Sequence, residues 1–417
     1  MLSYTDFFSR KVAKGKAFFD RQDQRRKLTI DLSSSSSVWL AGERRVGKTS
    51  AAIHVCSELE ANPSQYGINH FAWSECDISS CATIEATKRQ ILHTIADAAG
   101  KITGKSKKAI ELLKSAFARF DPELSVGGSD IAKLTLKLKS ISAEDSLQDA
   151  IIALDGLAKK QNSKAVIIID EFQTLAEIEQ ATGERIEWDI RAGLQHSDNV
   201  CMVFAGSKKR MMSEVFLNKS RGLYGMCRRI NIFELPKDDC IAHLTLASKQ
   251  CGYTFDAKAL EMIVDITLGH PRDFSHLSLQ VFEDSTFDNV KPKHISTDTV
   301  INAWGTYIKD VVIDEVSSLL KEKLNNNKRA EISTIQAIAH TRPRTNKIRT
   351  AKFAMLVGLS TTPIVGAIKN LEEQGLIRIV DERWSLCEPS YEESLKQISK
   401  YHFDPALIEA VKILSEQ

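Results

Sequence analysis

A glycine-rich segment near the N-terminus has the residue types and spacing of a loop that binds the phosphates of a nucleotide. The sequence VWLAGERRVGKTSAA spans residues 38–52 and contains Gly42-x-x-x-x-Gly47-Lys48-Thr49. A buried strand before the loop and an amphipathic helix after it would aim backbone N–H groups and the positive helix end at one anion. Lys48 would reach the β- and γ-phosphates, and the Thr49 hydroxyl would bind Mg²⁺. The residues expected to contact the nucleotide are Gly42, Glu43, Arg44, Arg45, Val46, Gly47, Lys48, Thr49 and Ser50.

A second segment supplies carboxylates at the end of a strand. In KAVIIIDEFQTL, residues 164–175, a continuous apolar run predicts a central parallel strand that is buried on both faces. Asp170 follows the run and is placed to hold Mg²⁺ through water. Glu171 comes next, where it could polarise the attacking water as a general base. Two adjacent acids can also cap a helix, but the phosphate loop upstream favours the chemical interpretation.

Three further strand candidates, at residues 70–73, 200–205 and 228–235, complete a predicted parallel sheet. One of them is expected to lie between the loop strand and the carboxylate strand. This extra strand, with a glutamate beside the Mg²⁺-directing aspartate, is typical of the additional-strand catalytic-glutamate class of P-loop ATPases. Ser207 follows strand 200–205, where that class has a polar residue against the γ-phosphate; a simple turn serine is the alternative.

These segments together resemble the archaeal-type ATPase family of the AAA+/STAND group. The matching stretches are GERRVGKTS, VIIIDEFQTL, CMVFAGSKKRMMSEVF, GLYGMCRRINIFELPKDD and GHPRDFSHLSLQ, in the family's order across about residues 17–390. The upstream FFDRQDQ, residues 18–24, resembles the family's entry motif near the adenine, which implies nucleotide contacts for Asp20 and Arg21. The resemblance implies an αβα ATPase core with a parallel sheet, a helical lid, and hydrolysis of ATP with Mg²⁺.

Residues 236–310 are predicted to form the helical lid. Within TLGHPRDFSHLS, Arg272 matches the place from which AAA+ lids offer an arginine to the γ-phosphate. Pro271 matches the proline with which STAND switches contact the base side of the nucleotide. Because the sequence carries both features, the motif does not assign one mechanism. Pro271 also suits the first turn of a helix, and Arg272 a surface salt bridge.

The resemblance also implies homo-oligomers in which an arginine of one subunit acts on the nucleotide of the next. Three arginines, Arg221, Arg228 and Arg229, surround the start of the last core strand, where such residues stand in AAA+ proteins. Adjacent residues of a strand face opposite ways, so Arg228 and Arg229 cannot share the role. Arg221 is the first choice.

The C-terminal third has the pattern of a winged helix-turn-helix. EISTIQAIAH, residues 331–340, is one amphipathic helix, and residues 350–377 predict a helix, a turn and a second helix. LIRIVDERWSLCEP then alternates like a two-stranded wing that turns near Asp381 and Glu382. The segment resembles the C-terminal domain of the same family and of origin-recognition initiators. Residues 328–387 hold ten lysines and arginines against five acids, a local net charge of +5.

Two interpretations of this domain stay open. In the first, it binds double-stranded DNA, with its second helix in the major groove. In the second, it folds back on the ATPase as a brake or pairs with a protein effector. The DNA interpretation places Thr361, Thr362 and Lys369 near bases and Arg342, Arg344, Lys347 and Arg349 on phosphates.

Composition limits the class of protein. The chain has 417 residues, 43% hydrophobic and 26% charged, as in soluble globular proteins. Its net charge of +2 means that nucleic-acid binding must rest on local patches. No stretch approaches the roughly 18 apolar residues of a membrane span, and the eight scattered cysteines are predicted to be reduced, in the cytoplasm.

The expected divisions are an N-terminal segment (1–16), the core (17–235) with an insertion at about 100–142, the lid (236–310), a linker helix (311–327), the winged helix (328–390) and a helical tail (391–417).

The function expected from these features is that of an ATP-driven switch which oligomerises and acts on or near DNA. Initiators, transposition regulators and mobile-element or phage defence proteins are the types considered. The alternative is a signalling switch that senses a protein. A processive helicase comes third, because no stacking-aromatic channel motif accompanies the core. Inside the insertion, IAKLTLKLKS at residues 131–140 predicts a strand with one lysine-rich face, either a solvated edge or a nucleic-acid contact.

Overall fold

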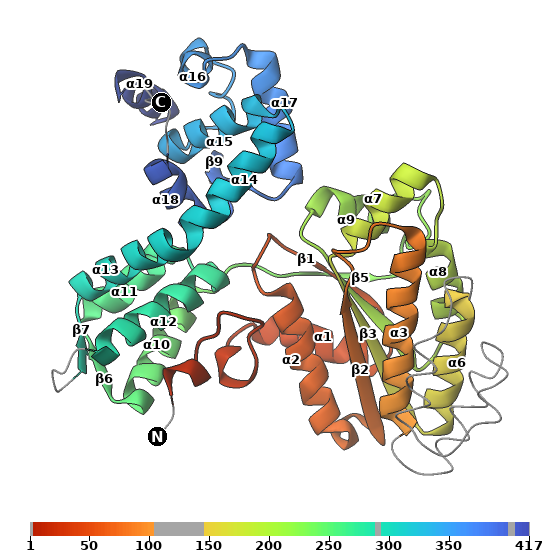
Figure 1. Cartoon of the computed structure of the whole chain (residues 1–417). Coiled ribbons are helices and arrows are strands. Elements are labelled where there is room, and N and C mark those ends of the chain that lie inside the picture. The colour runs from red at the N-terminus through yellow and green to blue at the C-terminus, as the bar shows by residue number, and fades with distance from the viewer. Residues whose placement is uncertain (1–2, 104–145, 288–292, 399–404, 417) are drawn as a thin grey trace. The chain divides into compact units, whose positions relative to one another are not determined.

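The computed structural model describes residues 3–103, 146–287, 293–398 and 405–416 (Figure 1). The predicted lysine-rich strand at residues 131–140 lies outside these ranges. The chain forms two compact units. The sheet unit comprises Arg21–Gly42 and Lys48–Ile232, and the helical unit comprises Met1–Asp20, Glu43–Gly47 and Phe233–Gln417. The tip of the phosphate loop therefore belongs to the helical unit, whereas Lys48 and Thr49 belong to the sheet unit.

The sheet unit is built on five parallel strands in the order β2-β3-β4-β1-β5 (Figure 1). β4 lies between the loop strand β1 and the carboxylate strand β3, which confirms the predicted extra strand. Every residue of β4 is buried, as expected for a central parallel strand. The strands are β1 (Val38–Ala41), β2 (His70–Asp77), β3 (Ser163–Asp170), β4 (Val200–Ala205) and β5 (Arg228–Asn231).

Helices cover both faces of this sheet (Figure 1). α1 (Gln22–Ser33) and α2 (Lys48–Ala61) pack on one face, and α3 (Ile84–Thr103) and α6 (Leu147–Lys160) pack on the other. In α6, buried Leu147, Ile151 and Leu154 recur at helical spacing, which gives the helix one apolar face toward the core. The described part of the unit also contains α7 (Gln173–Thr182), α8 (Glu187–Gln195) and α9 (Lys209–Leu217).

The first part of the helical unit is the predicted lid. It consists of α10 (Lys237–Cys251), α11 (Ala257–Thr267), α12 (Pro271–Phe287) and α13 (Thr297–Tyr307). Phe7 and Phe8 from the N-terminal segment are buried in its core. A short parallel pair, β6 (Tyr253–Phe255) with β7 (Lys293–Ile295), joins the helices and was not anticipated from the sequence.

The second part is the predicted winged helix. α13 continues through a π-helical turn (Ile308–Val312) into α14 (Ile313–Asn325). Asp381 and Glu382, both at positive φ, connect the two antiparallel strands of the wing at the predicted turn. Tyr391 and Leu395 of the following helix are buried in the same core. The remaining elements are α15 (Arg329–Thr341), α16 (Ala351–Val357), α17 (Thr361–Glu373), β8 (Ile377–Val380), β9 (Arg383–Leu386), α18 (Pro389–Ile398) and α19 (Pro405–Glu416).

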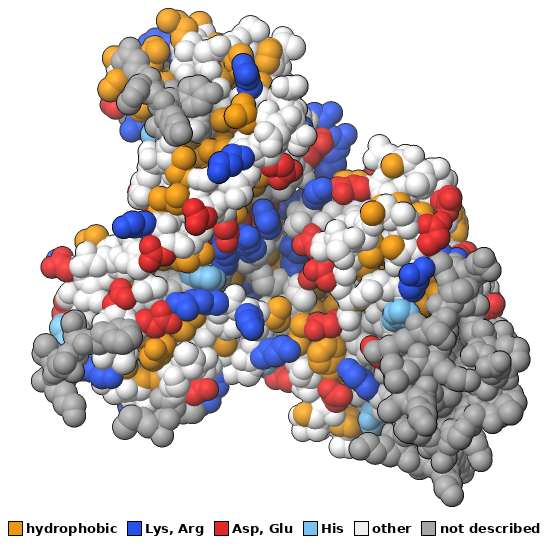
Figure 2. Space-filling model, viewed as in Figure 1, with side chains coloured by type: hydrophobic (Ala, Val, Ile, Leu, Met, Phe, Trp, Pro, Cys, Tyr) orange, Lys and Arg blue, Asp and Glu red, His pale blue; other side chains and the backbone are white. Residues whose placement is uncertain are grey.

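No single described helix is both long and apolar enough to cross a membrane. α16 and α17 reach that length and hydropathy only when taken together, and they meet at an angle of 73°. Their apolar residues Phe353, Ile364 and Leu371 are buried in the winged-helix core. On the face shown in Figure 2, acidic and basic side chains are interspersed, in line with the net charge of +2.

Candidate nucleotide-binding site

The phosphate loop follows β1 and leads into α2, as the motif predicts. Arg45 and Gly47 both adopt positive φ, of 60° and 86°. This conformation is cheap for glycine but unusual for arginine. α2 begins at Lys48, whose side chain is buried and whose ammonium donates to the carbonyl oxygen of Gly42 at 3.2 Å. The backbone thus turns tightly where a phosphate chain would lie.

Two side chains whose oxygen atoms can bind a metal ion meet at the start of α2. The Thr49 hydroxyl donates to a carboxylate oxygen of Asp170, the last residue of β3, over 2.5 Å. The other Asp170 oxygen accepts from the backbone N–H of Glu171 at 2.9 Å. Burial raises the pKa of Asp170, although these two hydrogen bonds oppose the shift. A hydroxyl and a carboxylate in contact suit Mg²⁺, a hard cation that takes oxygen ligands, so the predicted metal residues fit the ion.

Glu171 is held in place by two side chains from neighbouring turns. Its carboxylate accepts from the Ser207 hydroxyl at 3.0 Å and from the side-chain amide of Gln173. The Ser207 backbone N–H in turn donates to the Gln173 side-chain oxygen at 3.2 Å. Glu171 itself has a φ of 53°, a left-handed conformation that non-glycine residues adopt at a cost. The structure therefore brings the predicted base and the predicted polar residue together.

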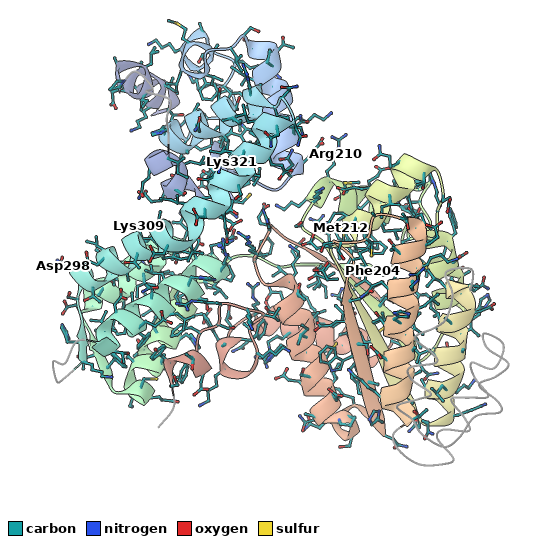
Figure 3. All side chains as sticks on the ribbon, in the orientation of Figure 1. Phe204, Arg210, Met212, Asp298, Lys309 and Lys321 are labelled. Carbon is teal, nitrogen blue, oxygen red and sulfur yellow. The ribbon has the colours of Figure 1, made fainter. Side chains whose placement is uncertain are left out.

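Gln173 was not identified from the sequence. It is buried at the start of α7 and bridges Glu171 and Ser207. Gly206 makes room for it, because a β-carbon at that position would lie 2.3 Å from the Gln173 side-chain oxygen and 2.6 Å from the Met212 sulfur. Phe204 and Met212 belong to the core next to this turn (Figure 3). The glutamine in DEFQTL, two residues after the predicted base, was the available signal.

Arg221 has a structural position instead of the predicted trans-acting one. It is only 7% exposed, and its guanidinium pairs with Glu179 at 2.7 Å and with Glu187 at 3.0 Å. An arginine enclosed by two carboxylates of its own unit does not fit a role on a neighbouring subunit. Arg228, half exposed, pairs with Asp31 at 3.1 Å, and Arg229 donates to the Asn231 side chain at 2.8 Å.

In the helical unit, the GHPRD segment lies at the start of α12. Pro271 is the first residue of that helix, a position that proline favours. Arg272 pairs with two carboxylates, with Glu315 at 2.5 Å and with Glu388 at 3.0 Å. The contact of Arg272 with a γ-phosphate and that of Pro271 with the base stay predictions.

The loop tip, which the same unit contains, has partners that the sequence did not indicate. The Glu43 carboxylate accepts from the Cys387 thiol at 3.5 Å, and the Arg44 carbonyl oxygen lies 3.3 Å from a ring nitrogen of His270. Arg45 pairs with Glu388 at 2.8 Å. Val46 is buried. Nothing in the motif itself distinguishes these side chains from other variable positions of a phosphate loop.

The two residues predicted to lie near the adenine precede α1. Asp20 and Arg21 both have positive φ, of 61° and 62°. Arg21 is buried and occupies the N-cap position of α1. Their contacts with the base stay predictions.

The residues predicted to contact DNA lie in the winged helix. Arg342 is exposed, yet it pairs with Glu392 at 2.8 Å, which neutralises part of its charge. Arg344, Lys347 and Arg349 lie in the connection before α16, and Arg349 is exposed. On α17, Thr361 is the first residue, and the side chains of Thr362 and Lys369 are exposed to solvent.

Comparison with known proteins identifies the fold. No family model matches the sequence, and no curated protein matches it. The Walker-type ATPase PABY2304 of Pyrococcus abyssi aligns over 94% of this chain and 99% of that chain, with a TM-score of 0.65 and 15% identity. The Aeropyrum pernix ORC2 protein, in its ADPNP-ADP complexes, aligns over 96% of this chain and 95% of that chain, with a TM-score of 0.56 and 13% identity. The chain therefore shares the fold of these two structures, which confirms the predicted class, an αβα P-loop ATPase core with a helical lid and a winged helix.

Proposed function

We propose that this protein is a Mg²⁺-dependent ATPase that works as a switch. One observation carries the proposal: Glu171, held by Ser207 and Gln173, directly follows the Asp170 that contacts Thr49 of the phosphate loop. A base, an oxygen pair for Mg²⁺ and a phosphate-binding lysine thus converge at the carboxyl ends of the strands. Ligands of open α/β sheets bind at this edge. The ADPNP and ADP in the ORC2 complexes support nucleotide binding by this fold.

Each residue has a role in the proposed reaction. Lys48 gives up its contact with the Gly42 carbonyl and binds phosphate oxygens. Thr49 and Asp170 would hold Mg²⁺, and the ion would supply positive charge next to the phosphates. Glu171 accepts a proton from the attacking water, and Ser207 keeps the carboxylate aimed while its hydroxyl faces the terminal phosphate. The hydrogen bonds from Ser207 and Gln173 fix the glutamate before substrate arrives, which lowers the cost of orienting it.

Two substitutions test the proposal. Lys48→Ala is expected to abolish binding of Mg-ATP while the fold stays intact, because it removes a charged contact with phosphate. Glu171→Gln is expected to bind ATP but to hydrolyse it about a hundredfold more slowly, the scale of a lost general base. Glu184→Gln, an exposed carboxylate on the loop after α7, is the matched control and should hydrolyse ATP normally. Unchanged turnover in Glu171→Gln would reject Glu171 as the base.

For the biological role we favour an oligomerising switch that acts on or near double-stranded DNA in the cytoplasm. The exposed Thr362 and Lys369 of α17 support this choice, as does the local net charge of +5. Initiators, transposition regulators and mobile-element defence proteins all fit such a switch. A trans-acting arginine is not assigned, since Arg221 is enclosed.

A second function has its own supporting observation. Glu388 lies two residues after the last strand of the wing, and it pairs with Arg45 of the phosphate loop at 2.8 Å. A signalling switch in which the winged helix restrains the ATPase until a protein effector binds would use such a contact. Measuring particle mass with ATP, alone and with duplex DNA, separates the two. Assembly that requires DNA supports the first function, and assembly with ATP that DNA does not affect supports the second.

A further inference from the structure

Two arginines of the helical unit converge on the same two carboxylates. One oxygen of Glu388 accepts from Arg45 at 2.8 Å and from Arg272 at 3.0 Å. Glu315 accepts from Arg45 at 3.1 Å and from Arg272 at 2.5 Å. The Tyr391 hydroxyl joins the cluster, at 3.1 Å from Arg45 and 3.0 Å from Glu315. Four distant segments of the chain therefore meet at one charged site: the phosphate loop, the start of α12, the start of α14 and the residues around the start of α18.

The cluster is a pair of ionised carboxylates between two guanidinium groups. Burial favours the neutral form of Glu388, but the charges of Arg45, His270 and Arg272 outweigh it and lower the pKa. Burial also favours the neutral form of Glu315. The charges of Arg272 and Arg45 outweigh this effect and lower the pKa of the Glu315 carboxyl. Glu388 has only 2% of its side chain exposed, so its charge depends on these arginines.

Neighbouring hydrogen bonds fix the positions of these segments relative to one another. Asp273, next to Arg272 and fully buried, accepts from the Ser390 backbone N–H at 2.9 Å and from its hydroxyl at 2.7 Å. The Tyr307 hydroxyl donates to the same carboxylate at 3.0 Å. Cys387 contacts Glu43, and His270 contacts Arg44. Together with the Arg45 contacts, three consecutive residues of the phosphate loop are therefore bound by the GHPRD and CEPSY segments. The arrangement is thus an interlocked cluster and not one isolated surface salt bridge.

A guanidinium group binds carboxylate and phosphate through the same planar set of donors. Two guanidinium groups that share two carboxylates are therefore arranged to share a phosphate. We propose that Arg45 and Arg272 form an anion site for the terminal phosphate of ATP, and that Glu315 and Glu388 occupy this site as internal competitors. We call these four residues the carboxylate latch. This inference rests on the proposed ATPase function and adds a role for Arg45, which the phosphate-loop motif leaves free to vary.

The latch has a specific consequence for nucleotide preference. ATP brings a third phosphate that competes with Glu315 and Glu388 for the arginines, whereas ADP lacks it. The latch therefore lowers the affinity for ATP more than the affinity for ADP. When ATP displaces the carboxylates, residues 387–391 lose partners on the loop, which transmits the nucleotide state to the winged helix. A ligand shifts such an equilibrium only through its different affinity for the two states.

The test measures the affinities of Mg-ADPNP and Mg-ADP by calorimetry. Glu315→Gln, with a third of its side chain exposed, removes one competing charge at little risk to the fold. It is expected to raise ADPNP affinity about fivefold or more, the lower end of ordinary coupling between sites, and to leave ADP affinity nearly unchanged. Glu388→Gln should act in the same direction. On a background that carries both Arg45→Met and Arg272→Met, Glu315→Gln should have little effect, because both contested arginines are gone.

Controls separate this inference from the proposed function. Glu331→Gln removes another buried carboxylate, one that pairs with Lys323 at 2.6 Å and touches neither Arg45 nor Arg272, so both affinities should stay at the wild-type values. If the wild type binds nucleotide but Glu315→Gln leaves the ADPNP-to-ADP preference unchanged, the latch is wrong and the ATPase proposal stands. If the wild type binds neither nucleotide, both are wrong. Hydrogen exchange gives a second measure: ADPNP, and not ADP, should speed exchange at residues 387–391, and equal rates would also reject the latch.

Discussion

At the scale of single residues, the geometry of the proposed base depends on a small gap at Gly206. A β-carbon there would lie 2.3 Å from the Gln173 side-chain oxygen and 2.6 Å from the Met212 sulfur. Gly206→Ala is therefore expected to push Gln173 away from Glu171, to slow hydrolysis and to lower the free energy of unfolding by about 1–3 kcal/mol. ATPase assays and denaturant unfolding measure the two effects.

A matched glycine serves as the control for that substitution. Gly156 lies in α6, and a β-carbon there would have no atom within 4 Å. Gly156→Ala should raise stability by up to about 1 kcal/mol, because alanine favours the helix, and should leave hydrolysis unchanged. Normal hydrolysis in Gly206→Ala would mean that the Glu171–Gln173–Ser207 arrangement does not position the base.

The parts of the candidate site that the sequence predicted are local. Lys48 and Thr49 follow a glycine-rich turn, and Asp170 and Glu171 follow an apolar strand, so short patterns were enough. The partners of Arg45 could not be predicted in this way, since Glu388 lies 343 positions further along the chain. Arg221 shows the same limit, because neither carboxylate that encloses it can be recognised from its neighbours in sequence.

At the scale of elements, α7 and α8 are joined through a buried charge cluster. Burial and the nearby charge of Glu187 raise the pKa of Glu179 to about 7, although Arg221 opposes the shift. The folded protein therefore binds this proton more tightly than the unfolded chain does. The resulting stability is present below the ordinary glutamate pKa and is lost as the pH rises through 7.

This linkage can be measured directly. Glu179→Gln cannot titrate, so its free energy of unfolding should fall less between pH 5 and pH 8 than that of the wild type, by up to a few kcal/mol. Glu177→Gln changes a more exposed carboxylate of the same helix and should keep the wild-type pH dependence. Identical slopes in the wild type and Glu179→Gln would show that Glu179 does not hold the proton.

Most elements were predicted because their patterns are strong. In β9 of the wing every second residue is buried, and the adjacent turn residues Asp381 and Glu382 mark the bend between its two strands. The β6–β7 pair was missed because each strand has only three residues. The π-helical turn between α13 and α14 was missed as well, since residues 308–312 fit an ordinary helical pattern. Short or irregular elements depend on packing partners that single-sequence patterns do not contain.

At the scale of the whole molecule, the open question is whether the winged helix binds DNA or restrains the ATPase. Reversing the charges of Arg344, Lys347 and Arg349 together separates the two. If these residues bind phosphates, the affinity for duplex DNA should fall strongly. The slope of the logarithm of the binding constant against the logarithm of the salt concentration should become less steep by about 0.9 for each lost phosphate contact. ATPase activity without DNA should then stay near the wild-type value. Glu315 and Glu388 pair with Arg45 and Arg272, which this variant keeps, so the carboxylate latch should stay closed.

A control triple variant keeps the net charge equal and moves the change elsewhere. Lys258, Lys309 and Lys321 are exposed in the same unit, on α11 and on the run from α13 to α14, and Figure 3 labels the last two. Reversing these three should leave duplex binding unaltered, since none lies in the helix-turn-helix or the wing. We expect the variant of Arg344, Lys347 and Arg349 alone to lose DNA in an electrophoretic shift. Raised basal ATPase activity and larger particles in that variant, with duplex binding intact, would instead identify the winged helix as a brake and reject the DNA-acting switch.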